Sequence, residues 1–283
     1  MTTVFRNFFL KYGIDMFPVV NVNALDNIYN FYMSNFSRLY EVYKMFEDEE
    51  SKKVFIAYIK GRITERLKDF RFAPEPQYFL QNCFPTQGDI AIDGGAYDGA
   101  TARDFSMQGA KVYSFEMDAK NYSNCVEVAE KYNFVIENFG LSNKKFESFY
   151  SEGGVGSSRQ DFDTGKKANF IDLDTYVIEK NLPRVDYIKL DIEGAELDML
   201  HGAAKTISRC KPKMAISAYH RWDDLWTLAE YIKSIRPDYK FMFRHYQIDG
   251  KDYFLNDEQR LVVSKFGIPY FVPRYCESVL YCI

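Results

Sequence analysis

The chain has 283 residues, of which 47% are hydrophobic and 17% aromatic, and its formal net charge is −4. This composition supports a packed core and excludes the basic field expected of a protein that binds nucleic acid or an anionic membrane. No apolar run approaches the roughly 20 residues that span a bilayer, and no signal peptide is recognisable. The five cysteines lack CxxC spacing, which is typical of reduced thiols. We therefore expect a soluble, bacterial-type cytoplasmic protein.

Two helical patterns are predicted in the first 80 residues. Apolar and aromatic side chains recur at helical spacing from Leu25 to about Phe46, and again from about Asp48 to Asp69. The segment Ala73–Pro76 (APEP) then breaks the pattern and is the predicted domain boundary. We expect residues 1–80 to form a helical N-terminal extension or cap. A homodimer contact through these helices is one expectation, and gating of a substrate is another.

From residue 81 onward, strand-like and helix-like segments alternate. Helices are predicted at about 101–108, 120–132, 173–179, 196–208 and 225–235. Strands are predicted at 90–92, 111–115, 133–137, 146–150, 169–172, 185–190, 213–217, 239–245 and 277–283. Such alternation predicts an α/β fold with a doubly wound, mostly parallel, Rossmann-like sheet in residues 81–283.

The turn after the first strand, Asp93–Gly99 (DGGAYDG), suggests a ligand site. A dinucleotide fingerprint would need glycine where this chain has Ala96 or Tyr97, so an NAD-dependent reductase is disfavoured. Gly95 and the last glycine of the turn let the backbone approach a ligand that has no phosphate. Glu116, which ends the second strand, can accept two hydrogen bonds from ribose hydroxyls. This combination resembles the first motif and the second-strand acid of class I S-adenosylmethionine (SAM) methyltransferases, and an ordinary strand-to-helix turn is the alternative.

Longer segments carry a more specific resemblance. The run that begins at Val185, VDYIKLDIEGAELDMLHGA, resembles the signature of the FkbM-type SAM-dependent methyltransferases. Three further segments agree in order: SFEMD at 114–118, FIDLDTY at 170–176 and AISAYHRWDDLW at 215–226. The resemblance covers about residues 86–283 and leaves the first 80 residues poorly covered. It implies a SAM-dependent methyltransferase domain that O-methylates a hydroxyl, usually on a sugar or a polyketide-like natural product.

The resemblance also implies roles for individual positions. Asp93, Gly95 and Gly99 would line the amino-acid moiety of SAM, Glu116 would hold the ribose, and Asn138 would lie near the adenine. The expected cofactor-binding set is Asp93, Gly94, Gly95, Ala96, Tyr97, Gly99, Glu116, Met117, Asn138 and Asp191.

A sugar hydroxyl is a poor nucleophile until its proton is removed, so a general base within hydrogen-bond reach is expected. Asp191 and Glu193 follow the strand predicted at 185–190, where the resemblance places them facing the methyl group. His220 follows the strand predicted at 213–217. His220 is the leading hypothesis for the base, and a structural imidazole bonded to a backbone carbonyl is the alternative. Trp222 could stack on a sugar face.

A divalent metal ion is a weaker alternative at the same strand ends. It would orient a diol and lower the pKa of a hydroxyl. No local spacing such as H-x-x-x-H supports it, so the sequence gives no metal site of its own. The ligands of this alternative would be Asp191, Glu193, His220, Asp224 and His245.

The leading functional hypothesis is therefore an O-methyltransferase acting on a sugar or glycan, such as a surface polysaccharide precursor. A lipid, a peptide or a small natural product is the alternative acceptor. From a different class, the chain could be a catalytically silent SAM-binding protein that docks a partner through the helices at 25–69.

Overall fold

The computed structural model describes residues 25–64, 67–151, 157–247 and 276–283. Contacts divide the chain into two compact units. The first contains the described residues of 1–74 and 243–278, and the second contains those of 75–242 and 279–283. The first unit thus includes a segment that the sequence places with the second. The division into domains at 1–80 and 81–283 stays a prediction.

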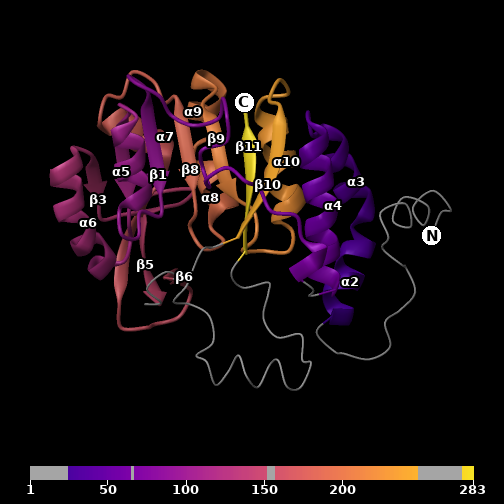
Figure 1. Ribbon diagram of the computed structural model, residues 1–283. Coiled ribbons are helices and arrows are strands. Elements are labelled where there is room, and N and C mark those ends of the chain that lie inside the picture. Colours follow the sequence, from indigo (N-terminus) through magenta and orange to yellow (C-terminus); the bar gives the residue numbers. More distant parts are fainter. Residues whose placement is uncertain (1–24, 65–66, 152–156, 248–275) are drawn as a thin grey trace, which may run out of the picture. The chain divides into compact units, whose positions relative to one another are not determined.

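The second unit is built on parallel strands that alternate with helices (Figure 1). The sheet has seven strands in the order β10-β11-β9-β8-β1-β2-β3. Neighbouring strands from β3 to β9 pair in parallel, whereas β11 is antiparallel to β9. This confirms the predicted doubly wound, mostly parallel α/β fold. Its elements are β1 (Ile90–Gly94), α5 (Ala100–Met107), β2 (Lys111–Phe115), α6 (Ala119–Tyr132), β3 (Val135–Glu137), α7 (Leu173–Glu179), β8 (Tyr187–Leu190), α8 (Glu196–Gly202), α9 (Ala204–Cys210), β9 (Lys213–Ser217) and α10 (Asp224–Ile235). Strands β10 (Phe241–Gln247) and β11 (Cys276–Cys282) contain residues of both units.

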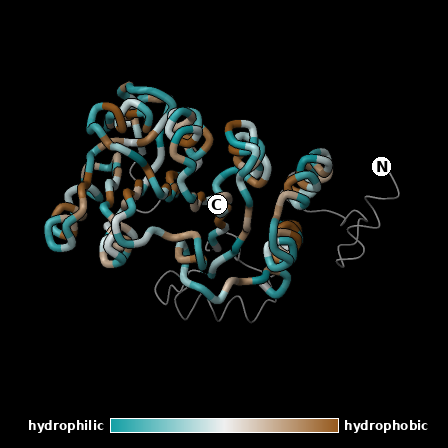
Figure 2. Tube along the Cα trace, turned by 90° about the horizontal axis from the view of Figure 1, so that it is seen from above, coloured by the Kyte–Doolittle hydropathy of each residue, from teal (hydrophilic) through white to brown (hydrophobic). Residues whose placement is uncertain are grey.

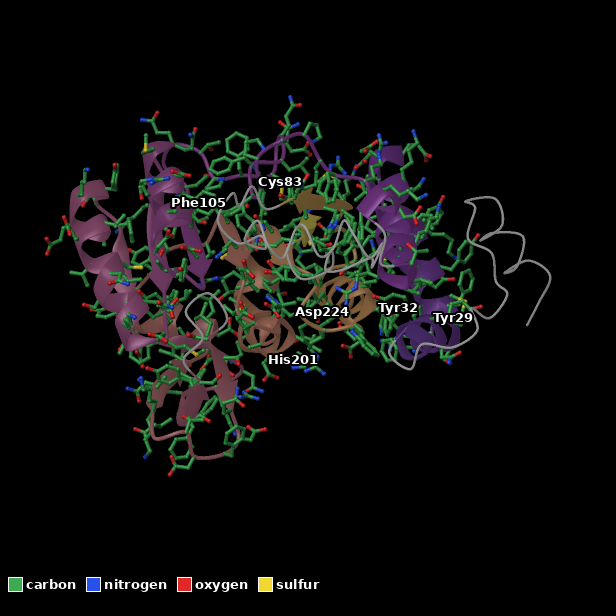
Figure 3. The ribbon with its side chains drawn as sticks, turned by 60° about the horizontal axis from the view of Figure 1, so that its bottom comes forward. Tyr29, Tyr32, Cys83, Phe105, His201 and Asp224 are labelled. Carbon is green, nitrogen blue, oxygen red and sulfur yellow. The ribbon has the colours of Figure 1, made fainter. Side chains whose placement is uncertain are left out.

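The core of this unit lies around β1 and β8, whose residues are all buried. Burial on both faces explains why these strands read as nearly continuous apolar runs. The helices instead alternate hydrophobic and hydrophilic residues along their length, which Figure 2 shows as brown and teal bands. Phe105 of α5 (Figure 3) is fully buried, and its ring lies 5.3 Å from that of Tyr187 on β8. The helices therefore cover the sheet with their apolar sides and fix its strand ends.

A second, smaller sheet follows β3 and was not predicted as a sheet. It has the order β4-β7-β5-β6, formed by β4 (Gly140–Leu141), β5 (Phe146–Ser151), β6 (Ser158–Gln160) and β7 (Lys167–Ile171). The stacked rings of Phe146 and Phe170, 4.9 Å apart, hold β5 against β7. Strands β5 and β6 extend below the main sheet in Figure 1. Arg159 of β6 pairs with Asp198 of α8 at 3.2 Å, which ties this sheet to the helix after β8.

The first unit contains α2 (Leu25–Ser34), α3 (Phe36–Met45), α4 (Glu49–Thr64) and the short 3₁₀ helix η1 (Leu67–Asp69). The single helix predicted from Leu25 to about Phe46 is therefore two helices. Asn35 separates them, and its side-chain amide donates to the carbonyl of Phe31 at 2.8 Å, which competes with continuation of the helix. Within the described ranges, no helix has the length and hydropathy of a segment that crosses a bilayer.

Candidate functional site

The glycine turn after β1 lies directly against the end of β8. Gly95 has a φ of +80°, and a Cβ atom on it would lie 1.9 Å from the carbonyl oxygen of Asp191. The backbone N–H groups of Gly95 and Ala96 both donate to the carbonyl of Phe115, which ends β2. Gly99 precedes α5 with a φ of +78°. These glycines therefore allow the ends of β1, β2 and β8 to meet at one edge of the sheet.

The remaining turn residues differ in how far they are exposed to solvent. Gly94 and Ala96 are buried, and the nearest atom to a Cβ on Gly94 would be a methyl carbon of Leu190. Tyr97 has a positive φ of 50° and, with 38% of its surface exposed, is one of the large hydrophobic residues that lie on the surface. A non-glycine residue in the left-handed region is strained, and such strain concentrates at functional sites.

A buried ion pair lies behind the turn. The ammonium of Lys189, in the middle of β8, is 3.1 Å from Oδ1 of Asp93, and both side chains are almost fully buried. Lys189 also donates to the carbonyls of Gly94 and Gly95, at 3.1 and 2.7 Å. The other Asp93 oxygen accepts from the hydroxyl of Ser114 on β2. Asp93 therefore stabilises the turn through its ion pair with Lys189, and its buried side chain does not project freely toward a ligand.

Glu116 is held in place by the backbone around it. Its two carboxylate oxygens accept from the N–H groups of Tyr97 and Asp118, both at 2.9 Å. Burial raises the pKa of Glu116 above its ordinary value, and these two backbone hydrogen bonds oppose the increase. The side-chain amide of Asn138 donates to the carbonyls of Glu116 and Met117. The structure thus brings together the predicted ribose and adenine positions at the end of β2.

Asp191, the first residue after β8, lies among polar side chains from two other segments. Its Oδ2 accepts from the hydroxyl of Tyr78 at 2.8 Å, and its Oδ1 accepts from the hydroxyl of Tyr219 at 3.2 Å. The Nε2 atom of His220 lies 3.4 Å from Oδ1. Two phenols and an imidazole therefore converge on one carboxylate, beside the glycine turn.

His220, after β9, contacts three carboxylates. Its Nδ1 lies 2.9 Å from Oε1 of Glu196, which is fully buried and also accepts from the N–H of Ile192. Its Nε2 lies 3.4 Å from Asp191 and 3.7 Å from Oε2 of Glu193. Burial lowers the pKa of His220, but the carboxylates outweigh it and raise the pKa to about 10. The imidazole is therefore protonated at neutral pH when no other cation is present.

Two further acids border this cluster. Glu193 has a φ of +55°, and burial together with neighbouring carboxylates raises its pKa. Asp224, at the start of α10 (Figure 3), accepts from the N–H of Arg221 at 2.7 Å. Burial and then Glu196 raise the pKa of Asp224 to about 8. At neutral pH Asp224 therefore largely keeps its proton, and the imidazole of His220 faces the carboxylates of Asp191, Glu193 and Glu196.

His245 lies in the first unit. It stacks on the rings of Phe70 and Phe72, lies edge-on to Tyr58, and contacts the hydroxyl of Ser278 at 2.8 Å. These contacts give it a packing role within the first unit, whereas Asp191 belongs to the second.

The aromatic candidates and the remaining histidine also have clear places. Trp226 is buried in α10, whereas Trp222 is 40% exposed in the turn between β9 and α10. His201 is on the surface of α8 (Figure 3), with its ring 4.2 Å from that of Tyr231. Of the two tryptophans, Trp222 is therefore the exposed one.

Sequence reasoning missed three residues of the site: Lys189, Tyr78 and Glu196. Lys189 had a signal, because it is a lone charge within an otherwise apolar strand. Glu196 lies in the quoted DIEGAE segment but was not singled out. Nothing near Tyr78 in the sequence indicates that its hydroxyl reaches Asp191.

Comparisons with known proteins bear on the family and the fold. The family model described as Methyltransferase FkbM domain matches residues 93–247, more than half of the chain. The structure is similar to that of a methyltransferase FkbM from Methylobacillus flagellatus, with a TM-score of 0.68 and 22% identity over 90% of this chain. This chain spans only 60% of that protein, and the likeness shows a shared fold. A putative rRNA methylase from Clostridium thermocellum gives a TM-score of 0.41 and 10% identity, over 74% of this chain and 96% of that one. An rRNA methylase from Streptococcus thermophilus gives a TM-score of 0.40 and 14% identity, over 70% of this chain and 87% of that one. No curated protein matches the sequence.

Proposed function

Because the chain belongs to the FkbM methyltransferase family, which implies the use of SAM, we propose that it transfers a methyl group to a hydroxyl of a sugar or glycan. The observation that carries this proposal is the convergence of Asp191, Glu193 and His220 beside the glycine turn. A surface polysaccharide precursor is the acceptor that we favour.

The residues around the turn fit the cofactor. The Glu116 carboxylate is buried and oriented, and each oxygen retains a lone pair that can accept from a ribose hydroxyl. Asn138 holds the backbone of Glu116 and Met117 and leaves its own amide oxygen for the adenine side. When bound, SAM supplies an activated methyl group, whose C–S bond breaks as the acceptor oxygen forms the new C–O bond. The protein then mainly aligns the two reactants.

The hydroxyl proton must pass to a base of this chain. His220 can accept it only from its neutral form, and its pKa of about 10 leaves little of that form at neutral pH. Glu193 is more exposed than His220, and its raised pKa makes it a stronger base than an ordinary carboxylate. We therefore place the proton on Glu193, with Asp191 aligning the acceptor.

The exposed indole of Trp222 supports a sugar acceptor. It follows His220 by two positions in the chain and is 40% exposed. Aromatic faces suit the C–H-rich face of a sugar ring, whereas the hydroxyls of the sugar suit the carboxylates of Asp191 and Glu193. A purely aliphatic acceptor would make no use of so many polar groups.

The proposal is tested by transfer of isotope-labelled methyl groups from SAM to sugars, sugar nucleotides, lipids, peptides and simple alcohols. We expect hydroxyl methylation of a sugar acceptor. His220→Gln and Glu193→Gln should each lower kcat by about 10²–10⁴-fold with SAM binding retained. The matched control is Glu230→Gln on α10, which should leave kcat unchanged. Methylation confined to nitrogen or to non-sugar acceptors would overturn the sugar O-methyltransferase.

A further inference from the structure

The acid-rich cluster beside the turn has a charge imbalance within the second unit. Three carboxylates contact His220, and all three follow β8 within six residues: Asp191, Glu193 and Glu196. Like charges at close range repel strongly where water is excluded. Such a cluster is stabilised by a bound cation.

Two unpartnered polar atoms point to a ligand within the cluster. Nε2 of His220 is buried and has no hydrogen-bond partner, on a side chain that is only 8% exposed. Oε2 of Glu196, on a fully buried side chain, also lacks one. Buried polar atoms normally have a partner, and a bound ion is one recognised reason for an exception. Ligand atoms of Asp191, Glu196 and His220 all lie within 4.8 Å of one another.

The spacing around Nε2 suits a metal ion. Its distances are 3.4 Å to Oδ1 of Asp191 and 3.7 Å to Oε2 of Glu193. Metal–ligand bonds of about 2.0–2.2 Å place neighbouring ligand atoms roughly 3–3.5 Å apart. Glu193 is not among the residues whose ligand atoms already lie within 4.8 Å of one another, so its side chain, which is 28% exposed, would have to move to complete the set. Glu193 has a left-handed backbone conformation, and Gly194 after it has a φ of +91°. The chain therefore turns sharply at Glu193.

The other ring nitrogen has the partner that a metal-bound histidine usually has. A ligating imidazole commonly donates its second N–H to a carboxylate, which fixes the tautomer and the ring orientation. Nδ1 of His220 lies 2.9 Å from Oε1 of Glu196, and that oxygen is itself anchored by the N–H of Ile192. Glu196 would therefore be a positioning residue, and Nε2 would face the ion.

We propose that Asp191, Glu193 and Nε2 of His220 bind one divalent metal ion, oriented by Glu196. Two carboxylates and an imidazole favour an ion of the Mn²⁺ or Zn²⁺ kind over Mg²⁺, which prefers oxygen ligands alone. Resting on the proposed function, the ion would bind the acceptor hydroxyl and lower its pKa, so that the proton leaves more easily. Asp224 would remain outside the ligand set, because the acids in ion-pair contact with the His220 ring are Asp191, Glu193 and Glu196.

The test is a titration of the full-length protein, stripped with a chelator, with Mn²⁺ followed by electron paramagnetic resonance. It is carried out with and without saturating S-adenosylhomocysteine, the demethylated product, which lacks the sulfonium charge. We expect one Mn²⁺ per chain. Asp191→Asn, Glu193→Gln and His220→Ala should each weaken its affinity at least about tenfold, and Glu196→Gln about 10–100-fold.

Asp223→Asn is the matched control, because this neighbouring acid pairs with Arg221 and should leave the Mn²⁺ affinity unchanged. Glu193→Gln alters a partly exposed side chain, so it remains informative if a buried variant fails to fold. No Mn²⁺ binding by wild-type protein in either condition would overturn the metal site. Binding that all four variants retain would overturn it as well.

Calorimetric titration with S-adenosylhomocysteine separates this result from the proposed function. Protein that binds the nucleoside but not Mn²⁺ refutes the metal site and leaves the methyltransferase intact. Protein that binds Mn²⁺ but not the nucleoside supports the metal site and counts against methyl transfer.

Discussion

Gly95 and the carbonyl oxygen of Asp191 are so close that any side chain at position 95 would collide with the end of β8. A Cβ atom there would lie 1.9 Å from that oxygen, and the φ of +80° adds strain for any other residue. We predict that Gly95→Ala destabilises the second unit by more than the roughly 1 kcal/mol of the backbone term alone and weakens SAM binding at least about tenfold.

Gly88→Ala measures the cost of placing alanine in a left-handed backbone conformation without any collision. Gly88 has a φ of +85°, but a Cβ atom on it would meet nothing within 4 Å. Urea unfolding followed by tryptophan fluorescence reports on the second unit, because both tryptophans, Trp222 and Trp226, belong to it. Equal losses of stability in the two variants would contradict the predicted collision.

Lys189 is expected to be the main support of the turn. Lys189→Met would leave the Asp93 carboxylate buried without its ammonium partner, which should lower the free energy of unfolding by about 3–5 kcal/mol. The double variant Lys189→Met/Asp93→Asn removes the uncompensated charge and should recover part of the loss. A double-mutant cycle from urea unfolding measures the coupling. Additive losses from the two substitutions would show that the pair does not interact.

His245 should make the protein sensitive to acid. Burial lowers its pKa from the ordinary 6.5 to about 3. Between these values the unfolded chain binds a proton that the folded chain does not, so stability falls as the pH falls. The full slope for one such proton is about 1.4 kcal/mol per pH unit. The loss begins as the pH drops below about 6.5 and is complete near pH 3.

His245→Phe keeps an aromatic ring against Phe70 and Phe72 but removes the titration. It should cost about 1 kcal/mol at neutral pH, through loss of the contact with Ser278, and flatten the decline between pH 6.5 and 4. Chemical denaturation followed by far-UV circular dichroism at several pH values measures both effects. Parallel declines in wild type and variant would mean that other groups cause the sensitivity to acid.

The sequence predicts the main sheet well because its signals are local. Short apolar strands such as β8 are recognisable in the sequence as buried elements. The polar residues that follow such strands were predicted to lie at one edge of the sheet, and His220 and Asp191 do meet there. The contacts that orient these acids are not local. Tyr78 reaches Asp191 across 113 positions of the chain, and no periodicity encodes that approach.

Other departures have specific physical causes. The Asn35 side chain interrupts the predicted N-terminal helix by bonding the carbonyl of Phe31. The small sheet depends on the pairing of Gly140–Leu141 with Phe170–Ile171, a parallel contact between short segments about 30 positions apart. Lys189 was read as one residue of an apolar strand, although burial of a lone lysine requires a partner such as Asp93.

The most direct test of the central claim is calorimetric titration of wild-type protein, Glu116→Ala and Glu130→Ala with SAM and with S-adenosylhomocysteine. Glu116 is buried at the end of β2 with both oxygens oriented, whereas Glu130 is exposed on α6 and serves as the control. We predict saturable binding of both ligands by wild type and by Glu130→Ala, and an affinity at least about tenfold lower for Glu116→Ala, because hydrogen bonds to a charged acceptor each contribute about 1.5–3 kcal/mol. Folded wild-type protein that binds neither ligand, or a Glu116→Ala variant that binds both as well as wild type does, would contradict this account of the site.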